Sequence, residues 1–331
     1  MKKVTKGQWN GYDTYILHSH ELEVTLLPRL GNNVIRIWDR VQQRDVLRHP
    51  DESELDFYLQ KPYHFGIPLL IPPGRIRRGH FSYAGQEYQF DRNTANDNHI
   101  HGLHRTQSWC VSDIEEDDEG CAITTEFVTS DDPNWIRQFP EPLKLEMTLR
   151  LQGASLKQTF KITHLGQNAT PFGLGLHTWF LIDGEPGRWN LKLPVSGLFK
   201  ADEELIPTGE IAPLGPWEAL NEGMNLQGVN CDTMLNIGGK PAVAALTRDD
   251  GYGLRYSADP EYFIFWVIYS KGEADQFFCI EPYTWLPDAP NSPLPAEQTG
   301  LIDLKPQQTV ELNLNLDIVY PAGESAPDSD A

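Results

Sequence analysis

Residues 143–163, LKLEMTLRLQGASLKQTFKIT, decide the fold class of this chain. Apolar and polar side chains alternate along 143–152, and they alternate again after a turn at Gly153 and Ala154. Because successive side chains of a strand point to opposite faces, this pattern predicts two antiparallel strands with one buried and one solvated face. Such a pair of strands is a building unit of an all-β protein.

Strand-like patterns recur along the rest of the chain. They lie at 15–17, 22–27, 34–38, 81–90 (read as a hairpin), 243–247, 254–256, 262–270 and 310–318. Helical periodicity is weak, and only 51–59 is expected to form a short helix. Many short strands with abundant Gly and Pro predict an all-β sandwich or barrel, and we expect a large antiparallel β-sandwich with few short helices.

The composition bounds the organisation and the partners. No repeat or linker is evident, so residues 1–320 are expected to form one domain, followed by a disordered acidic tail at 321–331. A net charge of −20 argues against nucleic acid and anionic membranes as partners. The first residues lack the apolar region of a signal peptide, and the four cysteines are scattered without a CxxC pair. These features predict a cytoplasmic monomer or homodimer that acts on a small molecule.

Two apolar stretches each carry one ionisable side chain. Residues 170–180, TPFGLGLHTWF, read as a buried strand that contains His177, and residues 276–285, QFFCIEPYTW, contain Glu281. Burying an ionisable group is unfavourable unless a partner or a function compensates. One interpretation is a neutral core histidine. The presence of both residues favours an acid and a base that the fold brings together.

Residues 61–79 contain four prolines among apolar residues, which excludes a regular helix or a central strand. A long shaped connection of this kind often carries binding residues. Arg75 follows a rigid Pro-Pro-Gly turn and is the candidate for binding hydroxyl or anionic groups. For Arg77 and Arg78, a place in a solvated basic turn is as plausible as a role in binding.

A second candidate site is the HxH pair at His99 and His101. In a strand these side chains would share one face, which is typical of some metal sites. Arg105 stands where cupin-type metalloproteins have a glutamate, and a cation beside it would be disfavoured. Hydrogen bonding of His101 to a polar ligand is therefore the favoured interpretation, and no metal is expected.

Several of these stretches, in order, resemble motifs of the aldose 1-epimerase (galactose mutarotase) family. They are GIPLLIP at 66–72 with Arg75-Ile76, His101-Gly102 with Trp109, PFGLGLH at 171–177, DEELIPTG at 202–209, IEPYT at 280–284 and GLIDLKP at 300–306. The resemblance implies a mutarotase-like supersandwich with an open sugar cleft, no cofactor, His177 as general acid and Glu281 as general base. It also implies that His101 and Arg75 orient the sugar. For the family's substrate-binding aspartate, Asp232 is the nearest carboxylate, although a gapless match would place Asn230 there.

The chemistry of anomer interconversion suits these residue types. A base removes the proton from the anomeric O1 while an acid on the opposite side of the acetal protonates the ring oxygen; the open aldehyde then rotates and the ring recloses. Such a reaction needs no cofactor.

The sequence departs from the family pattern in places. Gly74 stands where the family has Asn, and this departure and the ambiguity between Asp232 and Asn230 concern sugar specificity. Arg78 stands where a small or acidic residue is expected. A hexose-6-phosphate 1-epimerase is a competing interpretation if Arg75, Arg78 and Arg105 form a phosphate pocket. A non-catalytic sugar-binding protein on the same scaffold is a second competing interpretation, and a cupin-like metalloenzyme is a third.

Overall fold

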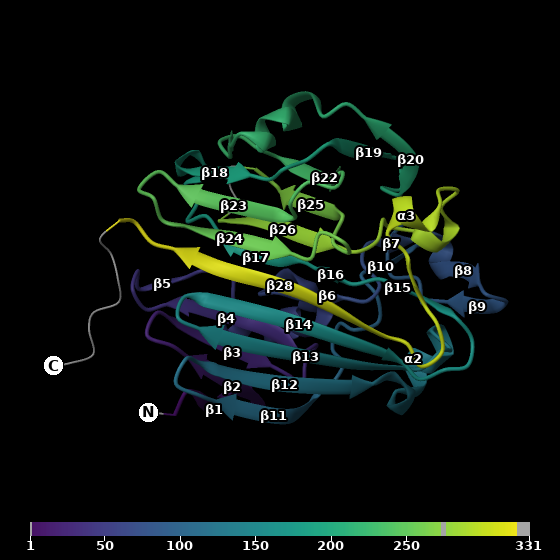
Figure 1. Ribbon diagram of the computed structural model, residues 1–331, viewed down its shortest axis with the longest axis horizontal. Helices are drawn as coiled ribbons and strands as arrows, with labels where there is room; N and C mark the ends of the chain where they lie inside the picture. Colours follow the sequence, from purple (N-terminus) through teal and green to yellow (C-terminus); the bar gives the residue numbers. More distant parts are fainter. Residues whose placement is uncertain (1, 273–275, 323–331) are drawn as a thin grey trace.

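The computed structural model describes residues 2–272 and 276–322. Its elements are almost all strands, and they form antiparallel sheets with a few short helices, so the predicted fold class is confirmed (Figure 1). The acidic tail predicted at 321–331 lies, from residue 323 on, outside the described residues. A single domain over residues 1–320 stays a prediction.

In the described part of the chain the largest sheet has nine strands. In spatial order they are β11 (Cys110–Glu116), β12 (Cys121–Val128), β13 (Leu143–Gln152), β14 (Ser155–His164), β28 (Thr309–Val319), β24 (Gly253–Ala258), β23 (Val243–Arg248), β18 (Trp189–Lys192) and β21 (Met224–Asn225). Strand β28 pairs with both β14 and β24, so the end of the chain joins the two halves of this sheet (Figure 1).

A second sheet, of eight strands within the described residues, carries the functional side chains discussed below. In spatial order they are β20 (Pro207–Ala212), β19 (Gly197–Ala201), β22 (Cys231–Asn236), β25 (Phe265–Ser270), β26 (Phe277–Tyr283), β16 (Gly175–Leu176) and β6 (Leu69–Leu70), and β17 (Thr178–Leu181) also pairs with β26.

The remaining elements are smaller. A further sheet contains β1 (Val4–Trp9), β2 (Tyr12–His18), β3 (Leu22–Leu27), β4 (Asn33–Asp39) and β5 (Arg44–Asp45). Paired short strands are β7 (Arg75–Ile76) with β10 (His99–Ile100), β8 (His80–Tyr83) with β9 (Gln86–Gln89), and β15 (Thr170–Phe172) with β27 (Ile302–Leu304). The helices are α1 (Leu55–Gln60), α2 (Pro133–Gln138) and α3 (Ala296–Thr299). Helix α1 confirms the helix expected at 51–59.

The pair formed by β13 and β14 confirms the alternation read from residues 143–163. Leu145 lies opposite Ile162 and Met147 opposite Phe160, and all four side chains are buried. The side chains between them are only partly buried or exposed. These buried residues belong to a hydrophobic cluster that extends from Val4 to Ile318.

Two stretches predicted as single strands are divided in the structure. Residues 170–180 form three short strands, because β15 pairs with β27, β16 with β6 and β26, and β17 with β26. Residues 262–270 form a strand only from Phe265, since Tyr262 and Phe263 donate backbone hydrogen bonds to Asp259 in a turn. Apolar composition predicted burial correctly at both sites, but it did not reveal where the chain changes partner.

Strand β25 separates the hydrophobic core from the site. Trp266 and Ile268 point into the main core, whereas Phe265 and Val267 point to the other face of the sheet and pack in a smaller cluster. Both faces are therefore buried, as predicted for this apolar run. Glu281 lies opposite Val267 on the neighbouring strand, so it shares the face turned away from the main core.

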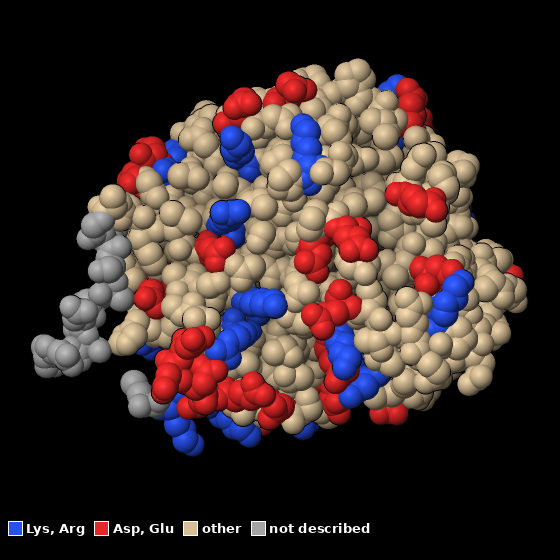
Figure 2. Space-filling view, viewed as in Figure 1, with Lys and Arg blue, Asp and Glu red and all other residues tan. Residues whose placement is uncertain are grey.

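Charged side chains of both signs are interspersed over the face that carries β28, without a continuous basic area there (Figure 2). Across β13, β14 and β28, the side chains of Glu146, Lys161 and Glu311 lie at neighbouring register positions. This face is therefore not the basic surface that nucleic acid binding requires.

None of the helices in the described residues has the length and hydropathy needed to cross a bilayer.

One buried histidine away from the cavity gives a test of stability against pH. His104 is fully buried, its Nε2 lies 2.8 Å from the carbonyl oxygen of Gly31, and burial lowers its pKa to about 4. Because this is below the unfolded value of about 6.5, its contribution to stability is present above pH 6.5 and is lost as the pH falls towards 4.

We expect the wild-type free energy of unfolding to lose about 2 kcal/mol through His104 between pH 7 and pH 5. Urea denaturation at both pH values measures this loss. His104→Gln retains an amide donor for Gly31 and does not titrate, so its loss over the same interval should be smaller by that amount. Equal losses in the two proteins would contradict the assignment.

Candidate functional site

The face of the second sheet that points away from the core forms the floor of a cavity of about 620 Å³. His177, Glu281, His101, Arg75 and Asp232, all singled out in the sequence, line it. These residues come from five separate segments of the chain, so the fold brings together every site residue predicted from the sequence. Such a cavity, with polar groups converging on one wall, is typical of a small-molecule site.

His177 lies between β16 and β17, where the backbone leaves the regular ladder. Its N–H donates to the carbonyl oxygen of Pro68 (3.0 Å), which anchors the strand junction to the proline-rich loop. The imidazole stacks on the indole of Trp179, with ring centroids 4.9 Å apart and an interplanar angle of 6°. The stacking restricts the ring orientation, so His177 is held against the cavity wall.

The glycines of the PFGLGLH stretch make room for aromatic side chains. A Cβ atom on Gly173 would lie 2.4 Å from the ring of Trp285, and one on Gly175 would lie 2.5 Å from the ring of Tyr283. The side chains that approach these glycines therefore follow Glu281 in the chain. The two stretches are therefore packed directly against each other.

Glu281 is 2% exposed and lies on β26. The hydroxyl of Tyr283, two residues further along the same face, donates to Glu281 Oε2 (2.7 Å). Burial raises the pKa of Glu281 well above its ordinary value; the bond from Tyr283 opposes this effect, and the charge of Asp232 adds to it. Sequence analysis missed Tyr283, although its spacing of two residues in a strand could have indicated a shared face with Glu281.

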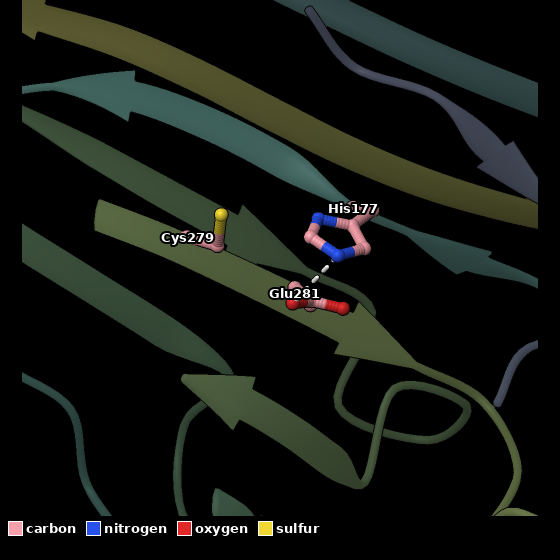
Figure 3. A group of neighbouring side chains, drawn as sticks. All are labelled: His177, Cys279 and Glu281. Carbon is pink, nitrogen blue, oxygen red and sulfur yellow. Dashed lines mark ion pairs between the residues drawn. The ribbon is translucent and has the colours of Figure 1, made fainter. Parts of the chain in front are cut away.

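The acid and base candidates are in direct contact. His177 Nε2 lies 3.4 Å from Glu281 Oε1 (Figure 3). Burial lowers the pKa of His177 to about 3, and the nearby His64 adds to the effect. Burial therefore favours the neutral form of both groups. The two groups lie side by side, not on opposite sides of a bound acetal as expected from the chemistry.

The two histidines of the HxH pair point to different surroundings, so they lack the shared face that a strand over both residues would give. His99 in β10 directs Nδ1 to the carbonyl oxygen of Asp91 (2.6 Å) and packs against Phe90. His101 has a left-handed backbone (φ 64°), which ends the strand and turns its side chain to the cavity. Its ring lies 5.6 Å from that of His177. Burial lowers the pKa of His101 well below its ordinary value, so it is a neutral hydrogen-bonding group.

Arg75 and Asp232 complete the polar lining. Arg75 makes no hydrogen bond or ion pair with the described residues, so its guanidinium is available to a ligand. Partial burial raises the pKa of Asp232, and the charge of Arg75 opposes this effect. Asp232 lines the cavity and Asn230 does not, which favours Asp232 for the family's aspartate position. A side chain at Gly74 would meet Pro287 at 2.5 Å, which explains the absence of Asn there.

The other arginines are engaged elsewhere and do not line the cavity. Arg77 pairs with Asp202 (2.5 Å) and Glu204 (2.9 Å), and Arg78 pairs with Glu204 (2.8 Å). Arg105 lies over the ring of Tyr63 and donates to the carbonyl oxygen of Ile100. The phosphate pocket of Arg75, Arg78 and Arg105 is therefore not assembled in the structure. Arg77 and Arg78 lie in a short turn with partly exposed side chains, which agrees with the solvated-turn interpretation, and both are paired with carboxylates.

The pairs made by Arg77 hold the turn between β19 and β20, a hairpin that borders the cavity with Leu198, Lys200 and Pro207 (Figure 1). Since loosening this turn would weaken binding more than chemistry, Arg77→Met is expected to raise KM by up to about tenfold with kcat nearly unchanged. Steady-state kinetics measures both. Arg188 has similar exposure and pairs with Glu185 and Asp249 away from the cavity, so Arg188→Met is the matched control. A shift of KM in both variants, or in neither, would contradict this role.

Besides Tyr283, the cavity has further aromatic side chains that were not predicted, and four of them are Tyr63, His64, Trp179 and Trp217. Trp179 stacks with His64 as well as with His177, and Tyr63 contacts both His64 and His101. Of these four, only Trp179 could have been predicted, because its spacing of two residues from His177 in a strand indicates a shared face. The others come from turns whose path is set by the tertiary fold.

Comparisons with known proteins agree with these motifs. A family model described as aldose 1-epimerase matches residues 13–317. The uncharacterized protein YphB of Escherichia coli K12 is 27% identical over 265 residues, which cover 77% of this chain and 83% of YphB. Galactose mutarotase of Homo sapiens is 28% identical over 169 residues, 49% of this chain and only 46% of that protein. A galactose mutarotase-like protein from Clostridium acetobutylicum has a TM-score of 0.89 at 24% identity, over 95% of this chain and 98% of that one.

Proposed function

Because this chain belongs to the aldose 1-epimerase family, we propose that it interconverts the α and β anomers of a free aldohexose, galactose or glucose, with Glu281 as base and His177 as acid. The observation that carries the proposal is the contact of 3.4 Å between His177 Nε2 and Glu281 Oε1 at the cavity wall. O1 and the ring oxygen are bonded to the same carbon, so two neighbouring groups can serve both atoms. Arg75, His101 and Asp232 would bind the sugar hydroxyls.

The pair needs one proton for the reaction. In the proposed resting form this proton is on Glu281, and in the proposed working form Glu281 is ionised and His177 is protonated. Both forms carry the same charge in total, so proton transfer across the contact converts one into the other without exchange with solvent. Glu281 then removes the O1 proton while His177 protonates the ring oxygen, which opens the ring; after rotation about C1–C2 the same steps in reverse close it.

The environment supports these roles. Trp179 fixes the plane of the His177 ring, and Tyr283 donates to the Glu281 oxygen that does not face His177. A hydrogen bond to the ionised carboxylate stabilises it as a base. The unpaired guanidinium of Arg75 would stabilise negative charge that develops on the sugar oxygens. The reaction as proposed requires no cofactor, and a cytoplasmic monomer or homodimer remains our prediction.

Polarimetry of freshly dissolved α-D-glucose and α-D-galactose tests the proposal. The protein is expected to speed equilibration above the buffer rate, and the ratio of the two rates gives the preference. Acceleration with hexose 6-phosphates alone would favour a phosphate-specific epimerase, although only Arg75 of the three candidate arginines lines the cavity. No acceleration with any of these sugars, together with binding of a sugar by calorimetry, would identify a non-catalytic binding protein.

A further inference from the structure

A thiol lies beside the proposed acid–base pair. Cys279 precedes Glu281 by two residues in β26, so both side chains leave the same face of the strand. Cys279 is fully buried and lies opposite Trp179 on one neighbouring strand and Tyr269 on the other, both of which line the cavity. The proposed reaction does not use this thiol. Its position directly beneath the cavity wall is therefore unexplained by sugar chemistry.

Three different kinds of donor atom lie close together in the side chains of Cys279, His177 and Glu281. One nitrogen, one sulfur and one oxygen of this group all lie within 4.8 Å of one another (Figure 3). A tetrahedral zinc ion with bonds of about 2.0–2.3 Å holds its ligand atoms roughly 3.3–3.8 Å apart. The 3.4 Å between His177 Nε2 and Glu281 Oε1 already meets this spacing, and the sulfur belongs to a group of donors that lie within 4.8 Å of one another.

The charges of the group also suit a divalent cation. A thiolate and a carboxylate neutralise a doubly charged ion, so the complex carries no net charge into a buried region. The strongly negative protein, with a net charge of −20, attracts cations from solution. His177 and Glu281 both border the cavity, which offers an entry path and an open fourth position.

We propose that His177, Cys279 and Glu281 form an inhibitory site for a thiophilic divalent cation of the Zn²⁺ class, which binds from the cavity and excludes the sugar. The exclusion rests on the proposed function, because the metal would occupy both the acid and the base. Thiolate, imidazole and carboxylate are the ligand types that zinc binds, and three protein ligands with one open position are typical of accessible zinc sites. Ligand side chains must lose their protons to bind a metal, so affinity should increase with pH.

Co²⁺ alone, added to the full chain, tests the site without any sugar. The expected result is intense visible absorption of a four-coordinate ion with a near-ultraviolet thiolate band, both abolished when Zn²⁺ is added. Cys279→Ser should lose the thiolate band and weaken Zn²⁺ binding in calorimetry at least about tenfold. Cys110→Ser, which removes an exposed thiol elsewhere, should keep the thiolate band and the Zn²⁺ affinity of wild type. A thiolate band that persists in Cys279→Ser, or no Co²⁺ binding by wild type, would overturn the proposal.

Inhibition is measured separately on anomer interconversion. Zn²⁺ should slow the wild-type reaction, EDTA should restore it, and added sugar should compete with the metal. Cys279→Ser and Cys279→Ala, each compared with its own metal-free rate, should need at least about ten times more Zn²⁺ for the same inhibition. Co²⁺ binding through Cys279 in a protein without epimerase activity would refute the proposed function and leave the metal site standing. An active enzyme that Zn²⁺ does not inhibit would refute the inhibitory site and leave the proposed function standing.

Discussion

Replacing Glu281 by Gln is expected to lower kcat for anomer interconversion by about 10²–10⁴-fold, the contribution of a positioned general base. The amide has nearly the same shape as the carboxyl group, so the packing against Tyr283 and the contact with His177 should survive. It cannot accept the O1 proton. His177→Asn should reduce kcat to a similar extent, because the ring oxygen then lacks its proton donor. Polarimetry with each variant at matched concentration measures both losses.

The matched control is Glu141→Gln. Glu141 is also buried, 5% exposed, and accepts hydrogen bonds from Asn168, but it does not line the cavity. Its replacement should leave the rate within about twofold of wild type, even if unfolding becomes easier. A Glu281→Gln variant that folds, as judged by circular dichroism, and retains the wild-type rate would refute the assignment of the base. A loss confined to KM would assign Glu281 to binding instead.

The second large effect concerns stability. Gly173→Ala places a methyl group 2.4 Å from the ring of Trp285, which is fully buried and donates from Nε1 to the carbonyl oxygen of Pro73 (2.9 Å). The ring cannot yield without losing that bond, so the backbone must move. We expect the free energy of unfolding in urea to fall by about 1–3 kcal/mol, the usual cost of overpacking a core.

The activity of this variant should fall as well. Pro73 precedes the turn that carries Arg75, and displacement of Trp285 would shift that turn. Gly187→Ala is the control, because its added methyl would meet only the end of the Gln227 side chain, on the surface. It should change stability by less than about 0.5 kcal/mol. Equal stability of wild type and Gly173→Ala would show that the two motifs tolerate a looser contact than the structure indicates.

Much of the strand pattern could be predicted from local sequence. Alternation along 143–163 gave the correct faces of β13 and β14, because a period of two depends only on the geometry of an extended chain. The division of 170–180 into β15, β16 and β17 could not be predicted. Strand breaks in an apolar run are set by which partner each short segment meets, and those partners are distant in the sequence.

In the candidate site, too, some features could be predicted from local sequence and others could not. His177 and Glu281 stood out as lone ionisable residues in apolar stretches, and the motif resemblance selected Arg75, His101 and Asp232. The Pro-Pro-Gly turn before Arg75 favoured it as a binding residue, but local sequence could not show which arginines are paired. Arg77 pairs with Asp202, whereas the Arg75 side chain makes no ion pair with the described residues. Nor could local sequence indicate that His101 turns to the cavity while His99 does not, since the difference depends on one left-handed residue.

By itself, the sequence determined the all-β class, the buried and solvated faces of its longest strands, and the chemical types of the residues at the site. These properties follow from side-chain periodicity and from the free-energy cost of burying charge, which act within a few residues. Only the tertiary structure decided that His177 touches Glu281, that Tyr283 and Trp179 hold them, and that Cys279 joins them. The contact of His177 with Glu281 joins adjacent strands from distant parts of the chain, and its distance depends on the register of the whole sheet.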